Sequence, residues 1–177
     1  MTTEELAIEL AATAESAGLT LAVAESCTGG LAAAAITAIP GASRFFLGGF
    51  VSYSNQAKER MLGVSEDCIG RNGAVSEETA LAMATGAAAA LGADCAFSIT
   101  GIAGPLGGSA EKPVGTFWFG FSLNGSAFAE ARRFDGDRTS IRDSSVRHAL
   151  GRIKELIRHA IELDNTRKAG VSFPQGK

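Results

Sequence analysis

The stretch that decides the fold is LTLAVAESCTGGLAAAAI, which covers residues 19–36. Its first part, residues 19–24, is a mostly apolar stretch of strand length and predicts a short buried strand. Thr28-Gly29-Gly30 then open an alanine-rich segment, which predicts a helix ending at Pro40-Gly41. The sequence therefore places Ser26 at the junction between a buried strand and the helix that follows it.

Strand and helix patterns alternate outward from this junction until a hairpin appears. Thr2 and Glu5 have the spacing of a capping box and predict a first helix that ends near Gly18. Asn124-Gly125 is a strong hairpin signal, so the strands that flank it should be antiparallel. Further helices are expected at about residues 54–63, 76–91 and 135–163, and further strands at about residues 45–53, 95–100, 114–123 and 126–134. The pattern predicts an α/β chain with a mixed sheet and helices on both faces.

Length and composition indicate one globular domain. The chain has 177 residues, 46% of them hydrophobic and 20% charged, and neither a repeat nor a linker divides it. We expect the domain to cover residues 1–164 and a flexible C-terminal tail to cover residues 165–177. A net charge of −3 gives no reason to expect nucleic acid or an anionic membrane as a partner. The acidic start is unlike a secretory signal, which makes the cytoplasm the expected location.

The cysteines and histidines do not suggest a metal site. Cys27, Cys68 and Cys95 form no CxxC pair, and we expect them to be reduced and mostly buried. His148 and His159 fall on one predicted helix, roughly 16 Å apart, which is too far for them to share a metal ion. A histidine-based metal site is therefore not expected, and no cofactor is expected.

The junction at residues 24–30 is the first candidate for chemistry. Unpaired N–H groups at the start of the following helix should face Ser26, where they could hold the oxyanion formed when its hydroxyl attacks a carbonyl. Gly29 and Gly30 would let a ligand approach the backbone closely. The alternative is that Ser26 or Thr28 only caps the helix. Cys27 could compete as the nucleophile, although packing in the core is the more common fate of such a thiol.

Two further segments could support a serine nucleophile. Tyr53, the only tyrosine, ends a predicted strand, and Lys58 lies about one helical turn beyond it. A buried lysine can act as the base where no histidine is near, although most lysines are solvated. A glycine-rich loop at residues 101–113 follows another predicted strand, which is where α/β sheets bind ligands, and its amides could hold a phosphate. The alternative is an ordinary long surface loop.

A pair of arginines near the start of the last helix could bind an anion. Arg138 and Arg142 share a helix face and could clamp a phosphate. The alternative is that they form surface ion pairs with Asp137 and Asp143, which would contribute little to stability.

Four motifs together resemble the CinA C-terminal family over nearly the whole chain. They are AESCTGG at residues 24–30, GGFVSYSNQAK at 48–58, GAVSEETA at 73–80 and TGIAGPLGG with KPVGT at 100–116. The resemblance implies a three-layer α/β/α fold with a mixed, mostly parallel sheet and one antiparallel hairpin. It also implies hydrolysis of the carboxamide of nicotinamide mononucleotide to nicotinate mononucleotide and ammonia, without a metal.

The resemblance also implies roles for individual residues. Ser26 holds the place of the nucleophile, and Lys58, Tyr53 and Thr100 hold the places of supporting catalytic groups. The residues expected to bind the nucleotide are Thr28, Gly29, Gly30, Asn55, Gly101, Ala103, Gly104 and one or both of Arg138 and Arg142. Leu106 departs from the small or acidic residue expected after Pro105, which affects the expected substrate contacts of that loop.

Two expectations concern the protein as a whole. The chain lacks the N-terminal domain of full-length CinA proteins, so the pyrophosphatase activity of that domain is expected to be absent. The aromatic-rich strand at residues 114–123, which includes Trp118, could face a partner subunit, and a homo-oligomer is expected. The alternative to an enzyme is a non-catalytic module that binds a pyridine nucleotide in a competence or DNA-damage context.

Overall fold

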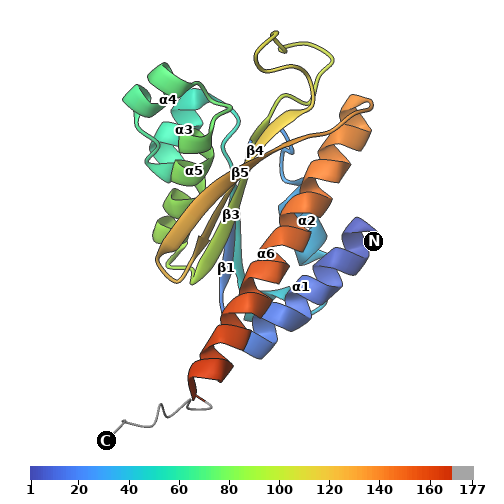
Figure 1. The fold of residues 1–177 in the computed structure, drawn as a ribbon, viewed down its shortest axis with the longest axis vertical. Helices are drawn as coiled ribbons and strands as arrows, with labels where there is room; N and C mark the ends of the chain where they lie inside the picture. The colour runs from blue at the N-terminus through green and yellow to red at the C-terminus, as the bar shows by residue number, and fades with distance from the viewer. Residues whose placement is uncertain (169–177) are drawn as a thin grey trace, which may run out of the picture.

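The computed structural model describes residues 1–168, which form a five-stranded sheet between two layers of helices (Figure 1). The strands, in the order β2-β1-β3-β4-β5 across the sheet, are β1 (Leu21–Glu25), β2 (Phe46–Val51), β3 (Cys95–Gly101), β4 (Thr116–Leu123) and β5 (Ser126–Arg133). The helices are α1 (Thr3–Ala17), α2 (Leu31–Thr37), α3 (Asn55–Leu62), α4 (Glu66–Asn72), α5 (Glu77–Leu91) and α6 (Arg138–Lys168), and η1 (Ala42–Arg44) is a short 3-10 turn.

The sheet is mixed, as expected. β1 pairs in parallel with both β2 and β3, whereas β4 pairs antiparallel with both β3 and β5. β4 therefore runs against the common direction of the other strands. Asn124 and Gly125, which join β4 to β5, both have positive φ angles of the kind that a two-residue hairpin turn requires. The expected antiparallel hairpin and the mostly parallel remainder are confirmed.

Each face of the sheet packs against its own layer of helices. α1, α2 and α6 cover one face, and α3, α4 and α5 cover the other (Figure 1). Because side chains alternate along a strand, Val23 and Phe97 enter the core under α1 and α6, while Ala22 and Ala96 face α5. The small side chains on the second face let α5 lie close to the sheet. This arrangement confirms the three-layer α/β/α fold.

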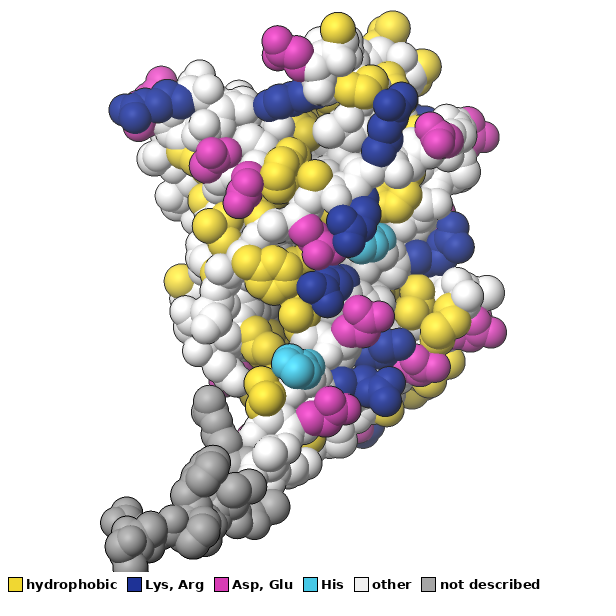
Figure 2. All heavy atoms as spheres, in the orientation of Figure 1, with side chains coloured by type: hydrophobic (Ala, Val, Ile, Leu, Met, Phe, Trp, Pro, Cys, Tyr) yellow, Lys and Arg dark blue, Asp and Glu magenta, His cyan; other side chains and the backbone are white. Residues whose placement is uncertain are grey.

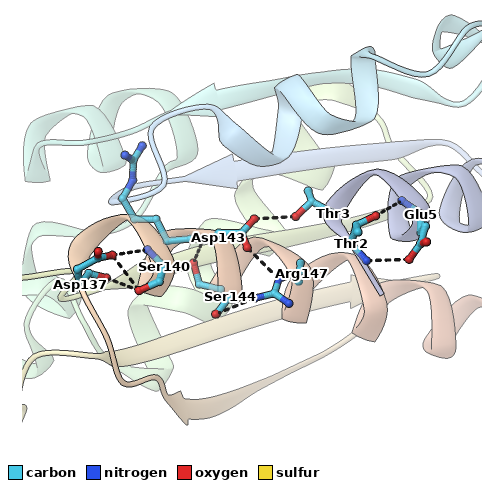
Figure 3. Close-up of polar contacts among 10 residues, drawn as sticks. Thr2, Thr3, Glu5, Asp137, Ser140, Asp143, Ser144 and Arg147 are labelled. Carbon is cyan, nitrogen blue, oxygen red and sulfur yellow. Dashed lines mark hydrogen bonds and ion pairs between the residues drawn. The ribbon is translucent and has the colours of Figure 1, made fainter.

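Side-chain caps define most helix ends where they were expected. Thr2 and Glu5 form the capping box of α1, and Ser76 caps α5. Ser54 caps α3, which resolves the choice between Ser54 and Asn55. The hydroxyl of Thr3 donates to Asp143 at 2.8 Å and so connects α1 to α6 (Figure 3).

The structure corrects the boundaries of two expected helices and adds a third helix. Helix α2 covers only Leu31–Thr37, so it begins later and ends earlier than expected. Helix α4 was not expected, although Ser65 caps it and two acidic residues follow. Helix α6 continues to Lys168, beyond the expected end near residue 163, so residues 165–168 of the expected tail are helical. Residues 169–177 lie outside the described residues.

The aromatic strand is not an edge of the sheet. β4 lies between β3 and β5, and the rings of Phe117, Phe119 and Phe121 are buried in the core. Trp118, on the opposite face of β4, is half-buried. That this strand faces a partner subunit stays a prediction, as does the homo-oligomer itself. No helix in residues 1–168 combines the length and hydropathy needed to cross a membrane.

Candidate active site

Ser26 lies where the carboxyl ends of the parallel strands meet. It directly follows β1, and its N–H donates to the carbonyl of Ile99 in β3 at 2.9 Å. On the other side of β1, the N–H of Ser52 donates to the carbonyl of Glu25 at 2.8 Å. Ligands of open α/β sheets bind at this edge, beyond the carboxyl ends of the strands. The fold therefore places the expected nucleophile at the edge where a ligand site is expected.

Lys58 reaches this edge from α3. Ser54 caps α3, and this fixes the first turn that carries the lysine. The side-chain amine of Lys58 lies 3.0 Å from the Ser26 hydroxyl oxygen, 2.9 Å from the Ser52 carbonyl oxygen and 3.3 Å from the Tyr53 carbonyl oxygen. Lys58 is only 1% exposed, and this burial holds the pKa of its amine below the ordinary value of 10.5. The solvated-lysine alternative is wrong.

Cys27 is a poor nucleophile in this setting. The residue is 7% exposed and packs in the core with Ile36 and Ile141. Burial raises the pKa of the Cys27 thiol to about 12, although Lys58 and two arginines act in the opposite direction. A thiol with such a pKa stays protonated and unreactive near neutral pH. The expectation that Cys27 packs in the core is confirmed.

Glu25 occupies the N-terminus of α2, a role that the sequence analysis did not assign. Its buried carboxylate accepts the N–H groups of Gly30 at 3.0 Å, Ala32 at 3.1 Å and Ala33 at 2.9 Å. A carboxylate at this position satisfies unpaired donors and interacts favourably with the helix dipole. The alternative that Ser26 or Thr28 caps α2 is therefore wrong, because the cap position belongs to Gly30 and the capping side chain is Glu25.

Six of the eight backbone N–H groups from residue 26 to residue 33 donate to an identified acceptor. Glu25 takes three of them, the N–H of Ser26 goes to Ile99, and the N–H of Gly29 donates to the Ser26 carbonyl at 3.1 Å. The N–H of Leu31 donates to the Thr28 carbonyl at 3.4 Å. Within residues 1–168, the N–H groups of Cys27 and Thr28 have no acceptor in another residue. The free donors next to Ser26 are thus these two, rather than the first turn of α2.

The two expected arginines contact backbone carbonyls rather than acidic side chains. Arg142 donates to the carbonyl of Cys27 at 3.0 Å and to that of Thr28 at 2.7 Å. Arg138 donates to the carbonyl of Gly104 at 2.7 Å. The surface-pair alternative is wrong, because Asp143 pairs with Arg147 and Asp137 accepts from Ser140 (Figure 3).

The other residues expected at the site differ in burial and in the contacts that they make. The hydroxyl of Thr100 donates to the carbonyl of Ala74 at 2.7 Å, and so ties β3 to the segment before α5. Tyr53 is 62% exposed, and its contact with Lys58 is made by its backbone carbonyl. Asn55 is exposed at the start of α3. The Thr28 hydroxyl is buried and, within residues 1–168, has no hydrogen-bond partner.

The glycine-rich loop is fastened to its neighbours at its base and exposed at its tip. Its base contains Gly101, the buried Ala103 and Gly104. The amine of Lys112 donates to the carbonyls of Asn72 at 2.9 Å and Val75 at 2.8 Å. Residues 105–111 are exposed, and the loop extends away from the sheet (Figure 1).

The arrangement of the His, Cys, Asp and Glu side chains in residues 1–168 bears on whether the protein could bind a metal ion. No group of three or more His, Cys, Asp or Glu side chains in residues 1–168 is arranged to hold a metal ion. His148 lies 2.7 Å from the carboxylate of Glu130, and His159 lines an apolar hollow of about 280 Å³ at the opposite end of the sheet from Ser26. The surface over β5 and α6 mixes positive, negative and apolar side chains (Figure 2).

Sequence reasoning missed several contributors to this site. Glu25 holds the start of α2, the Ser52 carbonyl binds the Lys58 amine, and Lys112 fastens the loop. A charged residue at the end of an all-apolar strand, directly before the candidate nucleophile, was a signal for Glu25. No sequence signal marks a backbone carbonyl such as that of Ser52.

Named relatives share most of this chain. A nicotinamide-nucleotide amidohydrolase PncC from Enterobacter agglomerans is 52% identical over 139 residues, which are 78% of this chain and 85% of that protein. A PncC from Escherichia coli strain K12 is 51% identical over 75% of this chain and 81% of its own length. A CinA-like protein from Citrifermentans bemidjiense is 50% identical over 87% of this chain, but the match spans only 37% of that longer protein.

Solved structures and a family model agree with these relatives. A competence/damage-inducible protein CihA from Agrobacterium tumefaciens has a TM-score of 0.83 and 46% identity, covering 87% of this chain and 94% of that one. A CinA superfamily protein from Klebsiella pneumoniae has a TM-score of 0.87 and 36% identity, covering 90% of this chain and 99% of that one. The model of the CinA C-terminal domain matches residues 3–157. The chain belongs to the CinA C-terminal domain family.

Proposed function

We propose that this protein is an amidohydrolase that converts nicotinamide mononucleotide and water into nicotinate mononucleotide and ammonia. The observation that carries the proposal is the buried amine of Lys58, 3.0 Å from the hydroxyl oxygen of Ser26. The names of the PncC relatives from Enterobacter agglomerans and Escherichia coli supply the substrate. Ser26 is the nucleophile and Lys58 is the proton acceptor in this proposal.

The surroundings of Lys58 suit a neutral amine. A neutral amine has two hydrogens and one lone pair. Donation to the carbonyls of Ser52 and Tyr53 uses both hydrogens, so the lone pair is left to face Ser26 at 3.0 Å. In this state the Ser26 hydroxyl donates a hydrogen bond to the amine. Burial, which lowers the pKa of Lys58, favours the same neutral form.

The free amides beside Ser26 are suited to hold an oxyanion. When Ser26 attacks the carboxamide carbon, negative charge develops on the former carbonyl oxygen. The N–H groups of Cys27 and Thr28 adjoin the nucleophile and have no acceptor in another residue within residues 1–168. Fixed donors of this kind stabilise the charge that develops in the transition state.

The reaction then proceeds in two steps through an acyl-enzyme. The Ser26 oxygen bonds to the carboxamide carbon as Lys58 takes its proton, and the carbon–nitrogen bond breaks as Lys58 returns that proton to the departing nitrogen, which leaves as ammonia. A water molecule then adds to the ester carbon and gives a proton to Lys58. The ester bond breaks, Ser26 recovers its proton, and the carboxylic acid product leaves.

Other site residues are assigned to binding or support. The buried, unpartnered hydroxyl of Thr28 is available to bond the substrate, and Arg138 or Arg142 supplies positive charge for its phosphate. Tyr53 and Thr100 support the lysine and the neighbouring backbone through the contacts described above. The proposed nucleotide contacts also include Gly29, Gly30, Asn55, Gly101, Ala103 and Gly104.

The test compares Ser26→Ala with Ser126→Ala. Ser126 is exposed at the start of β5, at the end of the sheet opposite the site. Ammonia and nicotinate mononucleotide are measured after incubation with nicotinamide mononucleotide. We expect Ser26→Ala to lower the rate by about a thousandfold or more, and Ser126→Ala to keep the wild-type rate. Mass spectrometry of the quenched wild-type reaction should find the acyl group on the peptide that contains Ser26.

Two outcomes would contradict the proposal. Equal rates for wild type and Ser26→Ala would remove Ser26 from the role of nucleophile. Calorimetric binding of nicotinamide mononucleotide without release of ammonia would favour the non-catalytic nucleotide-binding module instead.

A further inference from the structure

We propose that Arg142 is a positioning residue that holds the backbone after Ser26 in the orientation needed to bind an oxyanion, rather than a ligand of the substrate phosphate. The inference rests on the proposed amidohydrolase function and assigns one of its residues a distinct role. It starts from two hydrogen bonds, from Arg142 to the carbonyls of Cys27 and Thr28, at 3.0 and 2.7 Å.

These two bonds fix the orientation of two consecutive peptide groups. In a trans peptide, the carbonyl of one residue and the N–H of the next point in opposite directions. When Arg142 holds the Cys27 carbonyl on its own side, the N–H of Thr28 must face away from Arg142. Holding the Thr28 carbonyl likewise turns the N–H of Gly29 away from Arg142, toward the Ser26 carbonyl that it contacts at 3.1 Å.

The bond from Gly29 orients the third peptide group. It turns the Ser26 carbonyl toward Gly29, so the N–H of Cys27, which belongs to the same peptide group, faces the opposite way. All three peptide groups after Ser26 are therefore held through their carbonyls. Among residues 26–33, the N–H groups of Cys27 and Thr28 are left without an acceptor in another of the described residues, and their directions follow from these bonds.

The backbone after Ser26 needs contacts from elsewhere in the fold to keep it in one conformation. Gly29 and Gly30 have φ angles of 62° and 98°, in the left-handed region, and they lie before the first turn of α2. Glycines in this region can adopt many other conformations, so the local sequence does not keep the turn in one of them. A side chain added at Gly29 would lie 3.6 Å from the Arg142 guanidinium, so Arg142 contacts the turn closely.

Arg142 uses more of its guanidinium donor atoms in hydrogen bonds to the protein than Arg138 does. Two donor atoms of the partly buried Arg142 are engaged by the Cys27 and Thr28 carbonyls. Arg138 is exposed and uses one donor atom, on the Gly104 carbonyl, so the rest of its guanidinium remains available. A planar guanidinium with free donors suits a phosphate. The contacts therefore assign the phosphate to Arg138 and the backbone to Arg142.

The test uses two substrates that differ only in the phosphate, nicotinamide mononucleotide and nicotinamide riboside. The variants are Arg142→Lys, Arg142→Met and Arg138→Met, with Arg147→Met as the control on the same helix. Arg147 pairs with Asp143 and contacts neither the loop nor the nucleophile turn. Lysine keeps the positive charge but cannot span two carbonyls with a rigid fork, so Arg142→Lys separates charge from geometry.

The expected results differ for the two arginines. Both Arg142 variants should lower kcat about a hundredfold for both substrates, as expected when oxyanion donors are misplaced, and change KM little. Arg138→Met should raise KM for the mononucleotide alone, and Arg147→Met should change neither constant. The inference is overturned if the Arg142 variants raise KM for the mononucleotide and leave riboside hydrolysis unchanged, or if they keep the wild-type kcat.

A second measurement does not depend on turnover. Hydrogen exchange of the Gly29 amide, followed by NMR, should be at least tenfold faster in Arg142→Lys than in wild type and unchanged in Arg147→Met. If the wild-type protein does not hydrolyse the mononucleotide, the proposed function fails, and this exchange rate still decides whether Arg142 holds the turn. An unchanged Gly29 exchange rate in Arg142→Lys would overturn the inference.

Discussion

At the scale of single residues, the proposed mechanism depends on the protonation state of Lys58. An amine with the ordinary lysine pKa would be protonated and could not accept the Ser26 proton. Burial lowers that pKa, so we predict that kcat/KM rises with pH as Lys58 loses its proton and levels off below pH 10.5. Lys58→Arg should be about a thousandfold less active at every pH, because a guanidinium keeps its proton. Wild-type activity in Lys58→Arg would contradict the role of proton acceptor.

The same pKa predicts how stability depends on pH. Between the lowered pKa of folded Lys58 and about 10.5, the unfolded chain binds a proton at this residue that the folded chain does not bind. The free energy of unfolding contributed by Lys58 must therefore increase with pH across this window. We predict that urea unfolding at a series of pH values shows wild type gaining stability relative to Lys58→Met as the pH rises. A difference that is constant, or that falls with pH, would contradict the lowered pKa.

At the scale of elements, the short helix α2 depends on a side chain from the preceding strand. Both carboxylate oxygens of Glu25 accept backbone N–H groups of Gly30, Ala32 and Ala33. Glu25→Gln keeps the shape but replaces one acceptor with an NH₂ donor, which faces backbone donors. We predict a loss of about 1–3 kcal/mol in the free energy of unfolding, measured in urea. Glu4→Gln, exposed in the first turn of α1, should change stability by less than about 0.5 kcal/mol.

The elements also show how far sequence reasoning reaches. The buried strand before Ser26, the hairpin at Asn124-Gly125 and the cap at Ser76 follow from local patterns, and the structure confirms them. The start of α2 was misplaced because its cap, Glu25, lies outside the residues that normally cap a helix. Periodicity also overlooked α4, which has only 7 residues.

The site itself was only partly predictable. The pairing of Ser26 with Lys58 was expected from matching motifs and is seen at 3.0 Å. The contacts of Arg142 join positions 114 and 115 residues apart, and they end on carbonyls that every residue carries. Local sequence cannot show which carbonyl such a side chain will reach. Only the fold can therefore indicate whether Arg142 is placed to bind the substrate or to hold the backbone.

At the scale of the whole molecule, the two faces of the sheet present side chains of different size to their helix layers. The face under α1 and α6 carries large side chains such as Phe97 and Phe117, whereas the face under α5 is lined by alanines such as Ala22 and Ala96. The hydroxyl of Ser98 bridges the α5 layer and the sheet, because it donates to the Ala80 carbonyl at 2.6 Å and accepts the N–H of Gly120 at 3.1 Å. The position of α5, and of the α4–α5 segment held by Thr100, therefore depends on small residues at this contact.

Gly120 is the most direct test of this close packing. A methyl group at this position would lie 2.1 Å from the Ala80 carbonyl oxygen and 2.8 Å from the Ser98 hydroxyl oxygen, so α5 would have to move away from the sheet. We predict that Gly120→Ala lowers the free energy of unfolding by about 1–3 kcal/mol or more, the usual cost of overpacking a core. Gly70→Ala is the matched control, because Gly70 is exposed inside α4 and its added methyl would meet no atom within 4 Å. That change should raise stability by about 0.5–1 kcal/mol, since alanine favours a helix over glycine. If urea unfolding showed the same small gain for both variants, the close contact of α5 with the sheet would be contradicted.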